Sequence, residues 1–356
     1  MKKILTIFTG GTICTTLKNG VMNTTGEATA ALTELYKANN PDYIGRLSFE
    51  SGKSFGILSE NMTAEKWTDI ATYFLENLAG FSSYDGIIVA HGTDTLAFTT
   101  SLFSILLNGF DTPVIFVSGN YPILTEDGNP NPRSNGCANF DAAVECICRG
   151  IAPGVYATYQ NPADSKTYLH NGAHLIQCKI YDDNFYSRDA IDITNIEEVN
   201  FASLQSKTSG NSKLPIRRLE NKALKNCILK ITPYTGMNYD MFNLSEVKAV
   251  LHGTYHSGTA CTIKTDESPN YNNCSVLYFF EKCAAANIPF YFSPSQTGEK
   301  TNVYASVPFI EHHSFNGQRP IFLYGDTDEL LYAKLIFAYS AELSEKEIKD
   351  LLKQTF

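Results

Sequence analysis

The first half of the chain alternates short, almost uninterrupted apolar runs with longer amphipathic segments. Four apolar runs predict strands, at residues 4–8, 86–90, 113–117 and 154–159. Four amphipathic segments predict helices, at residues 27–37, 63–78, 95–107 and 138–148. Strands that are apolar throughout need a cover on both faces, which is typical of a mostly parallel sheet between two layers of helices. The sequence therefore predicts an α/β fold.

A polar stretch from about residue 200 to 226, rich in Ser, Thr, Lys and Asn, interrupts this alternation. Beyond it the alternation resumes, with strand-like runs at 228–232, 249–251 and 290–292 and helix-like segments at 274–286, 328–340 and 344–354. A chain of 356 residues is long enough for two domains. We predict a larger N-terminal α/β domain over 1–205, a linker over 206–226, and a smaller C-terminal α/β domain over 227–356.

Charge, hydropathy and cysteine spacing exclude several classes of protein. A net charge of −9, with Arg217-Arg218 as the densest basic spot, argues against a nucleic-acid partner. No apolar run approaches the roughly 18 residues of a membrane span, and the run that follows Lys3 is too short for a signal peptide, so we expect a cytoplasmic protein. The nine cysteines are scattered without a CxxC pair, which favours reduced thiols and predicts no metal site.

Two glycine-containing turns that present threonine follow predicted strands. They are Thr9-Gly10-Gly11-Thr12-Ile13 and His91-Gly92-Thr93-Asp94-Thr95. Neither has the spacing of a P-loop or a dinucleotide fingerprint. Ligands of parallel sheets bind beyond the carboxyl ends of the strands, and a threonine nucleophile needs a base and donors for an oxyanion. The structural alternatives are an ordinary glycine turn and a helix cap made by Asp94 or Thr95.

These two segments resemble the signature motifs of the bacterial-type L-asparaginase and glutaminase-asparaginase family. The resemblance continues in 58–63 followed by Trp67, in 113–119 and in 133–136, and the tail around 331–343 is similar to the cytoplasmic type I branch. It covers nearly the whole chain. It implies an amidohydrolase that converts L-asparagine to L-aspartate and ammonia through a threonine acyl-enzyme. It also implies no cofactor and a homo-oligomer, usually a dimer of dimers.

The resemblance also implies residue roles. Thr12 is then the nucleophile, and Thr93, Asp94 and a lysine form a second triad, for which Lys179 is the best match. Ser59 holds the α-carboxylate of the substrate and Asp94 its α-ammonium. For Lys179, the alternative is a solvated surface lysine. The predicted substrate-binding residues are Gly11, Ser59, Glu60, Gly92, Thr93 and Asp94.

One departure from the family pattern concerns the nucleophile. The family has a tyrosine in the loop after the first signature, about ten residues beyond the threonine, and it assists that threonine. Here residues 14–25 contain no tyrosine, and Val21 or Met22 stands at the matching place. Either Thr15 or Thr16 serves instead, or the first threonine works differently.

Three further departures surround the predicted site. Leu58 replaces a carboxylate before the serine, and residues 125–132 form an acidic, turn-rich insert. In the second domain, residues 253–259 stand where the family has a glycine-rich segment ending in an asparagine that reaches a neighbouring subunit. Tyr255 or His256 is a candidate for that contact, with a buried structural histidine as the alternative.

Two classes of function stay open at this point. The first is an amidohydrolase acting on asparagine, on glutamine, or on a larger amide such as a lipid-linked or tRNA-linked one. One methylene in a pocket is worth only about 1–3 kcal/mol, so the sequence does not predict the preference. The second is a catalytically weak asparagine-binding sensor on the same fold, which the missing tyrosine suggests.

Overall fold

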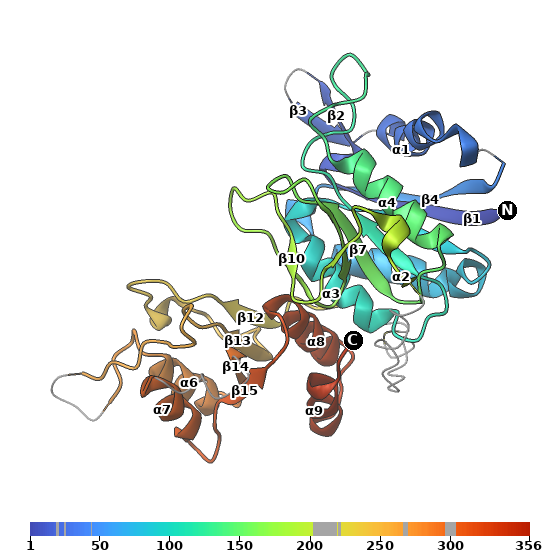
Figure 1. The fold of residues 1–356 in the computed structure, drawn as a ribbon. Helices are drawn as coiled ribbons and strands as arrows, with labels where there is room; N and C mark the ends of the chain where they lie inside the picture. Colours follow the sequence, from blue (N-terminus) through green and yellow to red (C-terminus); the bar gives the residue numbers. More distant parts are fainter. Residues whose placement is uncertain are drawn as a thin grey trace. The chain divides into compact units, whose positions relative to one another are not determined.

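The computed structural model describes two compact units, shown in Figure 1. The described residues are 1–18, 21–24, 26–43, 45–201, 219, 222–265, 270–295 and 304–356. The first unit comprises Met1–Leu224 and Gln354–Phe356, and the second comprises Lys225–Lys353. Most of the predicted linker, 206–226, lies outside the described residues, so the predicted domain boundaries stay a prediction.

The first unit is built on a seven-stranded sheet with the strand order β11-β8-β7-β6-β5-β1-β4. Neighbouring strands from β4 to β7 are parallel, whereas β8 and β11 are antiparallel to their neighbours. The strands are β1 (Lys2–Gly10), β4 (Leu47–Ile57), β5 (Gly86–Ala90), β6 (Val114–Val117), β7 (Val155–Gln160), β8 (Thr167–Asn171) and β11 (Ile191–Asp192). The small strands β9 (Leu175–Ile176) and β10 (Tyr186–Ser187) pair separately.

Helices cover both faces of this sheet, as the apolar strands require. Ile4 and Ile88 face one layer and pack with Val144 of α4 in one buried cluster. Leu5 and Phe74 belong to the cluster on the other face. The first layer contains α1 (Gly26–Asn39) and α4 (Gly136–Cys148), and the second contains α2 (Ala64–Phe81) and α3 (Leu96–Leu106). The predicted α/β class with a mostly parallel, doubly covered sheet is confirmed.

Two parts of the first unit differ from the expected secondary structure. Strand β4 was not predicted, because its sequence is rich in Ser, Gly, Glu and Lys; it lies at the sheet edge, where polar side chains reach solvent. Residues expected to form a loop after Thr12 instead include a hairpin of β2 (Thr15–Lys18) and β3 (Val21–Thr24), paired antiparallel.

The second unit has a four-stranded parallel sheet in sequential order. The strands are β12 (Ile228–Ile231), β13 (Ala249–His252), β14 (Phe290–Ser295) and β15 (Ile321–Tyr324). Val250 packs toward α6 (Val276–Ala285), and Leu251 packs toward α8 (Asp328–Ser340). The unit also contains α7 (Ser306–His312) and α9 (Glu345–Lys353). The expected smaller α/β layer structure is confirmed.

Among the described helices, none combines the length and the apolar character needed to cross a membrane. All nine cysteines are free thiols, and four of them are buried. Burial raises the pKa of Cys14 and of Cys146 to about 12, so both thiols stay protonated near neutral pH.

Candidate active site

Three turns meet where the neighbouring strands β4, β1 and β5 end. Gly11, directly after β1, has a φ of +80°, and a Cβ there would lie 2.1 Å from the Cα of Gly92. A Cβ on Gly92 would lie 2.3 Å from the Oγ of Ser59. Only glycine allows backbones and side chains to approach this closely. Both threonine turns and the serine turn are therefore in contact at the carboxyl edge of the sheet.

We expect Gly11→Ala to destabilise the first unit by about 3 kcal/mol, since the new Cβ adds overlap to an unfavourable backbone conformation. Gly109→Ala is the matched control: Gly109 has a φ of +81° but no atom within 4 Å of its Cβ position, so we expect a loss of only about 1 kcal/mol. Urea unfolding measures both. Equal losses for the two variants would mean that the turns are not tightly packed.

Thr12 is half-buried and begins a single 3-10 turn, Thr12–Cys14. Thr15 is fully buried and its hydroxyl donates to the carbonyl oxygen of Thr12 at 2.8 Å. Thr15 is therefore engaged in holding the turn. The side chain of Thr16, the other candidate replacement for the missing tyrosine, lies outside the described part of the chain.

Ser59 and Asp94 are joined directly. The Ser59 hydroxyl donates to Asp94 Oδ2 at 3.2 Å and accepts from the Asp94 backbone N–H at 3.4 Å. The hydroxyl of Thr95 donates to the carbonyl oxygen of Ser59 at 3.1 Å. Ser59 is buried, whereas Asp94 is exposed, so the carboxylate has one oxygen oriented by protein and access to a ligand.

A cavity of about 400 Å³ brings Thr93, Asp94 and Lys179 together. Lys179 is exposed, and no hydrogen bond or ion pair from its Nζ is found within the described residues. The three predicted triad members therefore line one cavity, but within the described residues Lys179 Nζ makes no hydrogen bond or ion pair with Thr93 or Asp94. Thr12 and Glu60 are not among the residues that line it, and Glu60 is exposed in the turn after Ser59.

Gln177 is a residue that the sequence analysis missed. Its Nε2 donates to the Thr93 carbonyl oxygen at 2.8 Å, and its Oε1 accepts from the backbone N–H of Ala97 at 3.2 Å. The predicted helix cap by Asp94 or Thr95 is wrong, because neither side chain accepts a hydrogen bond from the start of α3. Gln177 accepts from a backbone N–H in the first turn of α3 instead. A cap that lies 80 residues away leaves no local sequence signal.

His91 is neutral near pH 7. It is fully buried, and burial lowers its pKa to about 4, against smaller opposing effects of the Gly92 carbonyl and Asp94. Its Nδ1 lies 2.7 Å from the carbonyl oxygen of Gly92, which can only accept, so Nδ1 carries the proton. His91 therefore orients the turn that carries Thr93.

In the second unit, His256 is exposed, so the alternative of a buried structural histidine there is wrong. The buried histidine is His252, at the end of β13. Tyr255 is half-buried, and its backbone closes a turn through hydrogen bonds with Thr259 and Gly258 at 2.9 and 2.8 Å. A contact of Tyr255 or His256 with a neighbouring copy of the chain stays a prediction.

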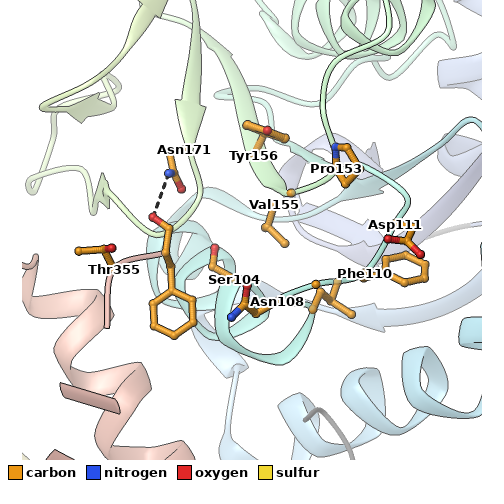
Figure 2. A pocket seen from close by; sticks show the side chains of 13 residues that line it. Ser104, Asn108, Phe110, Asp111, Pro153, Val155, Tyr156, Asn171 and Thr355 are labelled. Carbon is orange, nitrogen blue, oxygen red and sulfur yellow. Dashed lines mark hydrogen bonds between the residues drawn. The ribbon is translucent and has the colours of Figure 1, made fainter. Parts of the chain in front are cut away.

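A second cavity, of about 230 Å³, lies at the other end of the strands, beside the start of β7 (Figure 2). Its lining includes Ser104, Asp111 and Tyr156, and Asn171 Nδ2 donates to the carbonyl oxygen of Phe356 at 3.2 Å. It contains none of the predicted site residues. Since ligands of parallel sheets bind beyond the carboxyl ends, the Thr93 cavity is the better candidate for the active site.

Comparison with known proteins finds similar sequences and similar structures. The family model described as "Asparaginase, N-terminal" matches residues 3–206. A glutamyl-tRNA(Gln) amidotransferase subunit from Methanosphaera stadtmanae is 26% identical over 362 residues, which cover 99% of this chain and 75% of that protein. The protein of the same name from Halobacterium salinarum is 29% identical over 174 residues, 48% of this chain, and the match spans only 38% of that relative's length.

Solved structures share the fold along the whole chain. L-asparaginase I from Vibrio cholerae superposes with a TM-score of 0.67 at 21% identity, covering 100% of this chain and 98% of that one. The thermostable L-asparaginase from Thermococcus kodakarensis has a TM-score of 0.66 at 20% identity, covering 99% and 97%. At such identities the likeness concerns the fold.

Proposed function

Because this chain belongs to the asparaginase family, whose N-terminal domain matches residues 3–206, we propose that it is an amidohydrolase that converts L-asparagine to L-aspartate and ammonia. The observation that carries the proposal is the contact of Gly11, Ser59 and Gly92, which brings the Thr12 turn and the Thr93-Asp94 turn to one edge of the sheet. Two hydroxyls and a carboxylate at one site match the needs of threonine-based acyl transfer.

The proposed reaction has two nucleophilic steps. The Thr12 hydroxyl oxygen attacks the side-chain amide carbon and loses its proton to a base. The base passes this proton to the amide nitrogen of the tetrahedral intermediate, the C–N bond breaks, and ammonia departs, leaving an ester on Thr12. Water attacks this ester in the second step, releasing aspartate and restoring the Thr12 hydroxyl. Lys179 is the proposed base, acting through Thr93.

The substrate carries an ammonium and a carboxylate next to the reacting amide. Asp94, exposed and oriented by Ser59, is the proposed partner of the α-ammonium. Nearby backbone N–H groups and the Ser59 hydroxyl are the proposed donors to the α-carboxylate, and the hydroxyl turns from Asp94 Oδ2 to the substrate when it binds. Gly11, Gly92 and Glu60 form the adjacent backbone. We propose that no cofactor takes part.

Ammonia release from L-asparagine and from L-glutamine at neutral pH tests this function. We expect aspartate and ammonia in equal amounts from asparagine. Turnover of glutamine instead would keep the reaction class and change the substrate. Binding of asparagine without release would contradict hydrolysis and favour a sensor, the reading motivated by the missing tyrosine.

A larger amide is the second candidate substrate. The cavity of about 400 Å³ falls within the range of sites for drug-sized ligands, and the relatives named above are subunits of a glutamyl-tRNA(Gln) amidotransferase. Hydrolysis of asparaginyl peptides or of an aminoacyl-tRNA amide, with free asparagine unreacted, would favour this candidate.

We also propose a homo-oligomer, in the form of a dimer of dimers. Large apolar side chains gather around Lys179 on the surface of the first unit: Ile176, Ile180, Tyr181 and Tyr186 are all exposed. Apolar side chains clustered in this way are typical of surfaces that bind a partner. Light scattering of the purified chain would test this, and a monomer at all concentrations would contradict it. A cytoplasmic location also stays a prediction.

A further inference from the structure

Three polar residues form one row across adjacent strand ends, which we call the strand-end row: His91, Ser118 and Tyr159. The parallel register pairs Ala90 with Val117 and Val117 with Thr158. The members of the row directly follow these three residues in the chain: His91 follows Ala90, Ser118 follows Val117, and Tyr159 follows Thr158. Because side chains alternate between faces, all three point to the face opposite Ala90 and Val117, the face that α2 and α3 cover.

Each member of the strand-end row has a buried polar atom with no hydrogen-bond partner among the described residues. These atoms are His91 Nε2, Ser118 Oγ and the Tyr159 hydroxyl. His252 ends β13 with the same Nδ1 contact, to Gly253, but its Nε2 is bonded to the Tyr239 hydroxyl at 2.7 Å. Buried polar groups are normally paired, so the unpaired row is exceptional.

Tyr159 alone in this row lines the cavity that Thr93, Asp94 and Lys179 share. Its ring packs edge-on against Phe185, with centroids 4.8 Å apart. The side chain of Asn161 holds the backbone of Phe185 through two hydrogen bonds of 2.9 Å each: its Nδ2 donates to the Phe185 carbonyl oxygen, and its Oδ1 accepts from the Phe185 N–H. The phenol is therefore held rigidly against the cavity.

The Tyr159 hydroxyl remains a donor. Burial raises the pKa of Tyr159 above its ordinary value, and nearby Asp182 and Asp183 add to this, so the phenol stays protonated at neutral pH. The Asn135 side chain has a smaller opposing effect on the pKa, because its amide can donate to the phenol oxygen through the N–H that does not donate to the Gln160 carbonyl. The buried phenol O–H thus remains a protonated donor with no acceptor among the described residues.

We propose that Tyr159 is a specificity-determining residue, whose hydroxyl donates a hydrogen bond to an oxygen of the bound amino-acid amide. This inference rests on the proposed function and on the same cavity. It goes beyond that function because it assigns a binding role to a residue of β7, outside the threonine and serine turns. An unpaired buried donor destabilises the free protein, and substrate relieves this on binding.

Tyr159→Phe removes only the hydroxyl and tests the proposal. We expect KM for asparagine to rise about tenfold, with kcat within about threefold and a melting temperature that is unchanged or higher. Ser118→Ala is the matched control, because it removes an equally buried, unpaired hydroxyl of the same row that does not line the cavity. We expect its KM to equal that of the wild type.

An unchanged KM in Tyr159→Phe would overturn the inference while leaving the hydrolase function standing. An equal rise in KM for both variants would also overturn it, because the effect would then come through the fold. If the wild type releases no ammonia, calorimetry with L-aspartate replaces KM: weaker binding by Tyr159→Phe alone supports the inference. Equal binding, or none by the wild type, overturns it.

Discussion

Thr12→Ala is expected to lower kcat for asparagine hydrolysis by at least about a thousandfold, because it removes the proposed nucleophile while leaving the fold intact. The side chain is only half-buried, and the turn is held by the backbone of Thr12, which accepts from the Thr15 hydroxyl. Ammonia release under saturating asparagine measures the loss. A melting temperature within a few degrees of the wild type shows that the variant is folded.

Thr12→Ser is the control for this experiment, because it keeps the hydroxyl, and we expect it to retain measurable turnover. Cys14 offers no substitute nucleophile in the same turn, since its burial raises the thiol pKa to about 12. If Thr12→Ala keeps kcat within tenfold of the wild type, Thr12 is not the nucleophile. Loss of activity in Thr93→Val alone would then assign that role to Thr93.

Lys179→Met is expected to lower kcat by about a hundred- to a thousandfold, the usual contribution of a general base. Lys179 lines the cavity with Thr93 and Asp94, and methionine keeps the length and the apolar stem of the side chain while removing the amine. Steady-state ammonia release at neutral pH under saturating asparagine measures the loss.

Lys66→Met provides the matched control, since Lys66 is another exposed lysine of the first unit that lies outside the cavity lining. We expect its kcat to equal that of the wild type. If Lys179→Met behaves like Lys66→Met, Lys179 is a solvated surface lysine, the alternative that the sequence left open.

Much of the fold was predictable because its signals are local. The apolar runs that became β1, β5, β6 and β7 are buried on both faces, so their composition alone marks them as inner strands. Strand β4 is polar because one edge of a sheet faces water, and a polar strand resembles a loop in sequence. Thr63 caps α2 through another local signal, since its side chain accepts from the Lys66 N–H three residues later at 3.3 Å.

The candidate site was predictable in part. Its threonine turns were recognisable because glycine and hydroxyl residues directly follow apolar strands. Gln177 was not, because its two partners are the Thr93 carbonyl and the Ala97 N–H, far away in the chain. Tyr159 gave no signal either, since a tyrosine inside an apolar strand has the composition of an ordinary core residue.

The sequence by itself determined which segments become buried strands, which turns carry hydroxyls, and which family the chain resembles, because these depend on residue type and short-range spacing. Only the tertiary structure decided that Ser59 binds Asp94, that Gln177 caps α3, and that Tyr159 lines the cavity beside Lys179. The physical reason is that hydrogen bonds and burial depend on distances in space, and strand register and helix packing bring together residues whose separation along the chain carries no information.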